Sequence, residues 1–325
     1  MPRVPVAQLR FNQQLRKQPF LLREKVVSAT RGGSPMLRVT LADQSGSIPG
    51  VFFDVPAHVV ESLAVGRGVE VTGRVGEYRG QMQVQIERIA PTELTDLESY
   101  LPTTSRPLPE MEAEFDALRQ SVTDPNLKRL LGLIFGDPDI YRAFTRAPAA
   151  KYHHHACVGG LLAHTLAVVR LVLTACELYS DLDRDLMLTV ALLHDVGKIR
   201  AYDAVSFDLT EEGSLWTHLY MGASWVEHAI AQLPEFDPDL RLRVVHAILA
   251  HHGKLEHGSP VLPMTLEAIV LHGADNLDAH VQGALDQYER SYEDGESFTE
   301  HSAMHETRLY RGTSENPPPG QRPLF

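Results

Sequence analysis

The stretch Leu192-Leu193-His194-Asp195-Val196-Gly197-Lys198 places a histidine and an aspartate side by side at the end of an apolar run. The apolar residues that precede it, 185–191, predict the helix that carries the pair, and Gly197 is a candidate to end that helix. Imidazole and carboxylate groups together at a buried helix end suit a metal ion. The dipeptide alone does not establish a metal site, so the other histidines and aspartates of the chain decide.

Histidines and aspartates recur on both sides of this stretch, in segments that are also apolar and helical in pattern. His164 lies upstream, and His218, the pair His251-His252 and Asp275 follow downstream. This ordered set resembles the HD-domain metal-dependent phosphohydrolases in their two-metal form. A lone histidine on an apolar helix is usually a packed core residue, but five histidines and two aspartates in this family order favour a metal centre.

The local surroundings of these residues are similar to one branch of that family, the YhaM-type 3′-to-5′ exoribonucleases. The resembling segments are His154-His155-Ala156, Gly159-Gly160-Leu161-Leu162, His251-His252-Gly253 and Asp275-Asn276-Leu277-Asp278-Ala279. That family joins an N-terminal OB-fold to a C-terminal HD domain. The resemblance therefore implies a multidomain chain, with an all-β OB-fold barrel followed by an all-α HD domain.

The composition agrees with a globular, two-domain protein. The chain has 325 residues, of which 43% are hydrophobic, enough for two separate cores. Because we find no uninterrupted apolar run of about eighteen residues, we expect a cytoplasmic protein with no membrane partner. The two cysteines, Cys157 and Cys176, are too few for a disulfide framework and are expected to be reduced packing residues.

The charge is distributed unevenly along the chain. The formal net charge is −12, but residues 1–95 contain 12 Lys and Arg against 8 Asp and Glu, a balance of +4. The remaining residues contain 18 basic and 34 acidic side chains, a balance of −16. A basic module joined to an acidic metal-hydrolase module is one explanation. An ordinary soluble protein with uneven surface charge is the other.

The N-terminal part alternates apolar and polar residues with period two, which predicts half-buried antiparallel strands. The alternating segments are 37–41, 69–75 and 81–86, and a short helix is predicted near residues 57–64. Three strands, a helix and two strands is the order of an OB-fold, a small barrel that binds oligonucleotides on one face. The candidate nucleic-acid contacts on that face are Arg38, Phe53, Arg74, Tyr78 and Arg79. For Phe53, packing inside the barrel is an equally good explanation.

Four segments follow from these patterns. We predict an OB-fold nucleic-acid-binding domain over residues 1–95, opened by a basic arm over 1–19, and a proline-containing linker with entry helices over 96–150. An HD phosphohydrolase domain is predicted over 151–295. A mobile, polar C-terminal tail is predicted over 296–325.

The family resemblance implies two metal ions that share one carboxylate. One would be held by His164, His194, Asp195 and Asp275, and the second by Asp195, His218, His251 and His252. Nitrogen and oxygen ligands together suit Mn²⁺, Fe²⁺ or Zn²⁺ better than Mg²⁺, and the family suggests Mn²⁺. His246 and His272 lie near these ligands and are expected to support them.

The catalytic candidates beside Asp195 are Lys198, His154 and His155. Lys198 would neutralise charge on the phosphoryl group, and the alternative is a surface lysine that closes a helix. His154 and His155 would contact the phosphate or protonate the leaving oxygen, and the alternative is that they carry no function. His153 is the weakest candidate of the triplet.

The sequence favours a 3′-to-5′ exonuclease that hydrolyses single-stranded RNA to nucleoside 5′-monophosphates, with single-stranded DNA as a second substrate and a homo-oligomer implied by the family. The alternative is an HD phosphohydrolase of small nucleotides or cyclic dinucleotides whose OB-like domain serves assembly. The sequence Gly253-Lys254-Leu255-Glu256 departs from the Gly-Tyr-Pro of the cyclic-dinucleotide enzymes, which weakens that alternative. A strand-binding protein with a vestigial HD fold is a third class, and the full ligand set argues against it.

Overall fold

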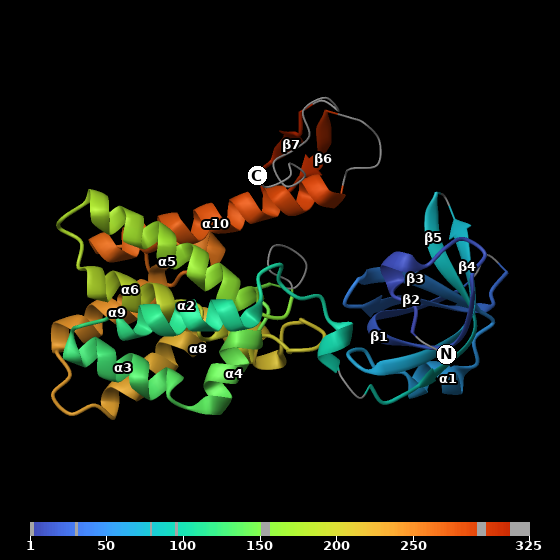
Figure 1. Cartoon of the computed structure of the whole chain (residues 1–325), viewed down its shortest axis with the longest axis horizontal. Coiled ribbons are helices and arrows are strands. Elements are labelled where there is room, and N and C mark those ends of the chain that lie inside the picture. The colour runs from blue at the N-terminus through green and yellow to red at the C-terminus, as the bar shows by residue number, and fades with distance from the viewer. Residues whose placement is uncertain are drawn as a thin grey trace. The chain divides into compact units, whose positions relative to one another are not determined.

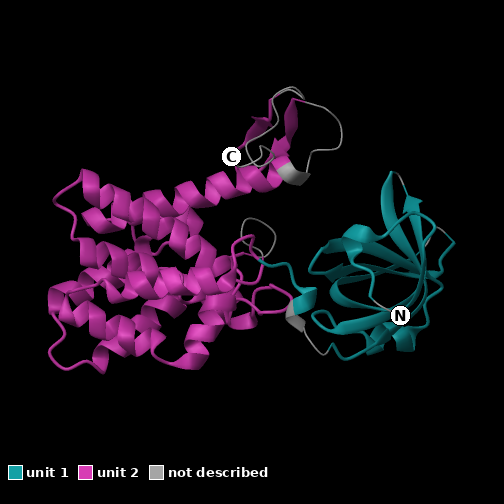
Figure 2. Cartoon of the chain, viewed as in Figure 1, with its two compact units in different colours: residues 1–103 teal, residues 104–325 magenta. Residues whose placement is uncertain are grey.

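The computed structural model describes residues 3–29, 32–78, 80–94, 97–150, 157–290 and 297–312. The chain divides into two compact units, residues 1–103 and residues 104–325 (Figure 2). The first unit is a β-barrel and the second is helical, as the sequence predicts (Figure 1).

The first unit is a closed five-stranded barrel with the strand order β1-β2-β3-β5-β4. Its elements are β1 (Gln14–Ala29), β2 (Pro35–Asp43), β3 (Gly46–Phe53), α1 (Ala57–Ser62), β4 (Gly68–Tyr78) and β5 (Gln81–Pro91). All neighbouring strands are antiparallel except β3 and β5, which pair in parallel through Gly50 and Val51. The predicted OB-fold order of strands and helix is confirmed.

Strand β1 is long enough to pair with two partners. Its first half pairs with β4 and its second half with β2, and its register shifts between Leu15 and Gln18 and again between Leu22 and Glu24. Such irregularities bend a strand and help a sheet to close. The inward residues of the alternating segments, among them Leu37, Val71 and Val84, are fully buried in the barrel core.

Both flanks of the barrel pack against it. Val6 and Leu9 of the expected basic arm are buried, and the Val6 N–H donates to the Asp43 carboxylate at 3.0 Å. Arg3 lies over the Tyr100 ring, 3.8 Å from its centroid, and 3.3 Å from Asp43. Tyr100 ends the 3₁₀ helix η2 (Leu97–Tyr100), so the start of the predicted linker packs with the barrel.

The second unit consists of packed helices. They are α2 (Leu108–Gln120), α3 (Pro125–Phe135), α4 (Pro138–Arg146), α5 (Gly160–Leu178), α6 (Arg184–Leu193), α7 (Lys198–Ala201), α8 (Glu211–Ala231), α9 (Pro238–Ala250) and α10 (Leu266–Arg290). Asp124, Asp137 and Asp237 each accept N–H hydrogen bonds at a helix start and are followed by proline at the first helical position. Both choices favour helix initiation, because a carboxylate caps free N–H groups and proline lacks one.

Helices α5 and α6 form the centre of the helical core. Every residue of α6 from Leu186 to Leu193 is buried. Helix α5 is long and apolar enough to cross a membrane by length and composition, and its buried residues, among them Leu161, Leu162 and Val169, belong to the core of the helical unit. Its His164 is buried with the apolar residues.

Gly197 has a different role from the one predicted. Helix α6 ends at Leu193, residues 194–197 form a tight turn, and Gly197 has an ordinary φ of −63°. A Cβ at Gly197 would lie 2.1 Å from the His218 carbonyl oxygen. Glycine is therefore required because the backbone of α8 packs directly on this turn, which brings His218 to the HD pair.

Helix α8 is interrupted at Thr217, which has φ 63° and ψ 152° inside the helix. This is a backbone conformation that side-chain-bearing residues rarely adopt. The interruption comes immediately before His218, so it reorients the chain at that residue.

The expected mobile tail contains a hairpin instead. Strands β6 (Phe298–Ser302) and β7 (Thr307–Tyr310) pair antiparallel beside the C-terminal end of α10 (Figure 1). The Gln287 side chain donates to the Glu300 carbonyl at 3.0 Å, and the Tyr288 hydroxyl donates to the Tyr310 carbonyl at 3.1 Å. The polar residues beyond 312 lie outside the described part of the chain.

Candidate metal centre

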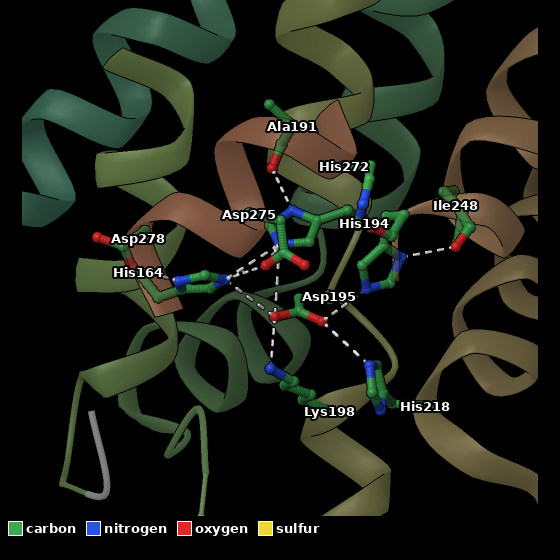
Figure 3. A network of polar contacts seen from close by, with 11 residues as sticks. His164, Ala191, His194, Asp195, Lys198, His218, Ile248, His272, Asp275 and Asp278 are labelled. Atoms are coloured by element: carbon green, nitrogen blue, oxygen red, sulfur yellow. Dashed lines mark hydrogen bonds and ion pairs between the residues drawn. The ribbon is translucent and has the colours of Figure 1, made fainter. Parts of the chain in front are cut away.

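The carboxylate of Asp195 lies at the middle of a cluster of imidazole groups (Figure 3). Its Oδ2 is 3.5 Å from His164 Nε2 and 3.4 Å from His194 Nε2. Its Oδ1 is 3.3 Å from His218 Nε2 and 3.5 Å from His251 Nε2. Each carboxylate oxygen therefore faces a different pair of histidines, which is the arrangement of a carboxylate that bridges two cations.

The remaining two predicted ligands complete the two groups. Asp275 of α10 places Oδ1 3.1 Å from His164 Nε2. His252 lies beside His218 and His251, and one ligand atom from each of these three histidines lies within 4.8 Å of the others. One ligand atom from each of His164, His194 and Asp195 likewise lies within 4.8 Å of the other two. The structure thus brings all seven sequence-predicted ligands together.

The histidine tautomers are fixed by backbone carbonyls. His194 Nδ1 is 2.8 Å from the Ala191 oxygen, His251 Nδ1 is 2.7 Å from the Ile248 oxygen, and His252 Nδ1 is 2.8 Å from the His257 oxygen. A carbonyl only accepts hydrogen bonds, so each Nδ1 carries the proton and donates it. The lone pair of each neutral ring is then on Nε2, the atom that a metal binds.

His164 is oriented by a carboxylate rather than a carbonyl. Its Nδ1 donates to Asp278 Oδ2 at 2.7 Å, and Asp278 is buried. Ligating histidines commonly donate their second ring N–H to such a partner. The sequence prediction did not assign Asp278 a role, although it follows Asp275 by three residues and therefore lies on the same face of α10.

Two imidazoles of the cluster, those of His218 and His252, favour the neutral form, and the Asp195 carboxylate favours the ionised form. Burial, together with the ammonium of Lys198, lowers the pKa of His218 well below its usual value, and burial lowers the pKa of His252 to about 4. Burial opposes ionisation of Asp195, but the positive charge of Lys198 and the neighbouring imidazoles of His194 and His251 together outweigh burial and hold the pKa of Asp195 well below the usual range. Metal binding requires these protonation states.

Several buried polar atoms of the cluster have no hydrogen-bond partner, and a bound cation would satisfy them. His218 Nε2, His251 Nε2 and Asp195 Oδ1 are buried and form no hydrogen bond within the described residues, and Asp195 Oδ2 has an ion pair with Lys198. Buried polar atoms without partners are rare and costly. Their convergence, with the donor set of nitrogen and oxygen, fits divalent transition-metal ions.

Lys198 lies beside the cluster. Its Nζ is 2.7 Å from Asp195 Oδ2, and its side chain is 13% exposed. The alternative of a surface lysine that closes a helix is therefore wrong, because the ammonium is paired with a buried carboxylate at the start of α7.

His272 and His246 support different parts of the site. The His272 Nδ1–H donates to the carbonyl of the ligand residue His251 at 2.9 Å. Gly253, with φ 77°, is required beside it because a Cβ there would lie 2.2 Å from the His272 ring. His246 Nε2 accepts from the Met264 N–H at 2.9 Å and so holds the loop between α9 and α10 rather than a ligand.

His154 and His155 fall outside the described residues, as does His153. Arg79 of the barrel unit also falls outside them. The roles predicted for these residues remain predictions from the sequence.

The barrel unit carries a groove of about 570 Å³ on its outer surface. Arg38, Phe53 and Tyr78 line it, with Gln81, Gln83 and residues of β1, β2 and β3. The Phe53 side chain is 54% exposed, so packing inside the barrel is the wrong explanation for it. Arg74 is exposed on β4 but is not among the residues that line the groove.

Comparisons with known proteins agree with both units. Residues 161–280 match the family model of the HD domain, and residues 24–92 match that of an OB-fold nucleic-acid-binding domain. The 3′-5′ exoribonuclease YhaM of Bacillus subtilis is 31% identical over 300 residues, which cover 91% of this chain and 94% of that protein. The YhaM protein of Bacillus velezensis is 34% identical over 267 residues, covering 81% of this chain and 84% of that protein. The YhaM protein of Bacillus pumilus is 32% identical over 299 residues, covering 89% of this chain and 93% of that protein.

Proposed function

Because the chain belongs to the YhaM family of 3′-5′ exoribonucleases, we propose that it is a metal-dependent exonuclease that shortens single-stranded RNA from the 3′ end and releases nucleoside 5′-monophosphates. The observation that carries this proposal is Asp195, whose two oxygens face two separate groups of imidazoles. A second carboxylate, from Asp275, completes one group.

Two Mn²⁺ ions are the proposed cofactors, with Fe²⁺ and Zn²⁺ as alternatives. His164, His194, Asp195 and Asp275 would hold one, and Asp195, His218, His251 and His252 the other. When bound, such a pair lowers the pKa of a coordinated water and polarises the phosphoryl oxygens.

The chain's own residues then act around that pair. The carbonyls and Asp278 that hold each Nδ1–H keep the rings in one orientation, so little reorganisation is needed when substrate binds. The Lys198 ammonium, which is paired with Asp195 at 2.7 Å, would stabilise electrostatically the negative charge that grows on the phosphoryl group. On sequence grounds, His154 and His155 remain candidates to contact the phosphate or protonate the leaving 3′ oxygen.

The barrel groove is the proposed binding surface for the single strand. Phe53 and Tyr78 offer exposed rings for base stacking, and Arg38 offers charge for phosphate. RNA is the proposed substrate and single-stranded DNA a second one. A homo-oligomer is proposed on family resemblance, and the mass in solution tests it.

An end-labelled oligoribonucleotide tests the function. Digestion from the 3′ end yields a descending ladder from a 5′-labelled strand and immediate release of labelled mononucleotide from a 3′-labelled strand. Chelated protein is expected to be inactive and to recover with Mn²⁺ more than with Mg²⁺. Full activity after verified metal removal, or turnover of free nucleotides or cyclic dinucleotides in place of the strand, contradicts the proposal.

A further inference from the structure

The two ligand groups of the metal centre differ in their burial. The group formed by His164, His194 and Asp195 is buried throughout. In the second group, His251 is buried but His218 and His252 are partly exposed. The structure around the second group therefore restrains its side chains less completely.

His252 is also oriented by a different kind of acceptor. His194 and His251 donate their Nδ1–H to carbonyls three residues earlier, at the end of the helix that leads to each histidine. His252 donates instead to the carbonyl of His257, five residues later, at 2.8 Å. His257 ends the short 3₁₀ helix η3 (Leu255–His257), in the loop between α9 and α10. The orientation of the His252 ring therefore depends on the conformation of that loop.

Residues 254–259, here called the η3 loop, are closed by backbone hydrogen bonds of their own. The Lys254 carbonyl accepts from the His257 N–H at 3.1 Å and from the Ser259 N–H at 3.2 Å. The Gly258 N–H donates to the Leu255 carbonyl at 3.0 Å. Residues 254–258 are all exposed. Because a segment with exposed backbone hydrogen bonds opens at lower cost than a buried helix, the support of His252 can open while the helices stay folded.

Gly258 keeps the η3 loop closed through its backbone conformation. It ends η3 with φ 91° and ψ 1°, in the left-handed region that favours glycine. A Cβ at this position would meet no atom of the described residues within 4 Å. A side chain here therefore strains the backbone without a clash, so the loop can be loosened by itself from this position.

We propose that the η3 loop is a positioning element for His252, and that the metal position of His218, His251 and His252 consequently fills second and empties first. The inference rests on the proposed metal-dependent function and assigns a surface loop a role in it. A cation at this position needs the Nε2 lone pair of His252 in place, and the His257 carbonyl keeps it there by holding the Nδ1–H. The closed loop thus sets how much Mn²⁺ the protein requires.

Calorimetric titration of the chelated full-length protein with Mn²⁺ tests the order of filling. The wild type should show two binding events of unequal affinity. His252→Ala removes a side chain of the second group, so it should abolish the weaker event and leave the tighter one close to its wild-type value. Loss of the tighter event in His252→Ala would contradict the proposed order.

Gly258→Ala tests the loop itself. Because alanine is disfavoured in the left-handed conformation, the weaker Mn²⁺ event should lose about 5–30-fold in affinity while the tighter event stays unchanged. Gly258→Asn should behave like the wild type, since asparagine adopts this conformation more readily although it is larger than alanine. The matched control is Gly33→Ala, which introduces the same strain, at φ 85° and in open space, in the turn between β1 and β2. Both binding events should be unchanged in it.

The outcomes separate the loop from the metal centre. An unchanged weaker event in Gly258→Ala overturns the inference, and so does an equal loss in both events, which would indicate general destabilisation of the helical unit. Two events of equal affinity in the wild type also overturn it. A wild-type protein that binds no Mn²⁺ refutes the proposed metal centre itself, which is a separate result.

Discussion

The metal centre and the barrel groove hold their functional side chains in opposite ways. At the metal centre, His164, His194 and His251 are buried, and each donates its Nδ1–H to a fixed acceptor. In the groove, Phe53 is 54% exposed and Tyr78 is 59% exposed. One site is pre-organised and the other adaptable.

This difference follows from what each site is proposed to bind. A pair of metal ions and a phosphoryl group have the same geometry in every turnover, so fixed imidazoles stabilise the reaction without reorganisation. A single strand presents different bases at each step, and exposed rings can stack on any of them. Substitutions at the two sites should therefore separate turnover from strand affinity.

The largest effect is expected from Asp195→Asn, which removes the charge that faces both imidazole groups while it keeps the volume. Turnover should fall by at least about 10³-fold, since both metal sites lose their shared ligand. Metal analysis should show reduced Mn²⁺, and strand affinity measured by anisotropy should be retained. The control is Asp181→Asn at an exposed position. Wild-type turnover in Asp195→Asn would exclude this carboxylate from the centre.

The next effect is expected from Asp278→Asn, which alters the acceptor for the His164 Nδ1–H. Loss of such a partner typically weakens metal binding by about 10–100-fold. Turnover should therefore need more Mn²⁺ for half-activation and should recover at high Mn²⁺, unlike that of Asp195→Asn. A Mn²⁺ titration that superimposes on the wild type would show that Asp278 is only a packing residue.

In the groove, Phe53→Ala should weaken strand binding by about 1–3 kcal/mol, the contribution of one stacked base. Metal content and turnover at saturating strand should not change. Phe11→Ala is the matched control, because Phe11 is 59% exposed on the N-terminal flank and is not among the residues that line the groove. Equal affinities of the two variants would mean that the strand binds elsewhere.

Two arginines of the barrel sharpen the same comparison. Arg38 lines the groove and Arg74 does not. Arg38→Ala should lower the dependence of log affinity on log salt by about 1, as for one lost phosphate contact. Arg74→Ala should leave that slope closer to the wild-type value. The reverse ranking would place the strand across β4 instead.

The smallest effect concerns stability. Asp185 Oδ2 accepts from the Thr123 N–H, the Thr123 hydroxyl and the Asp124 N–H, each at 2.7 Å, and so joins α6 to the start of α3. Burial opposes its ionisation, but these hydrogen bonds lower the pKa of Asp185. Asp185→Asn should lower the free energy of unfolding by about 1–2 kcal/mol at pH 7.

The pH dependence of that loss has a definite sign. A lowered folded-state pKa gives stability that is present above the ordinary aspartate pKa and is lost as pH falls through the folded value. Denaturant titrations should therefore show the gap between wild type and Asp185→Asn closing in acid. A gap that stays constant down to pH 2 would show that the carboxylate charge does not matter.

The sequence predicts much of this molecule because its strongest constraints are local. The ligands had to be histidines and aspartates on apolar helices, and barrel strands had to alternate, so both patterns were visible without coordinates. The roles of Asp278 and Gly197 could not be predicted from the sequence, because they depend on which helices contact each other. The hairpin of β6 and β7 was missed because its residues are polar. The local pattern of apolar and polar residues cannot show that this segment packs beside α10.

The interruption of α8 at Thr217 has a consequence for how this protein can change. With φ 63° and ψ 152°, Thr217 occupies a conformation that costs a side-chain-bearing residue about 1–3 kcal/mol and costs glycine almost nothing. Thr217→Gly removes no ligand and relieves that strain at the residue that precedes His218. A single exchange at this position thus gives the protein thermal tolerance with which it can later accept destabilising substitutions elsewhere in the helical unit.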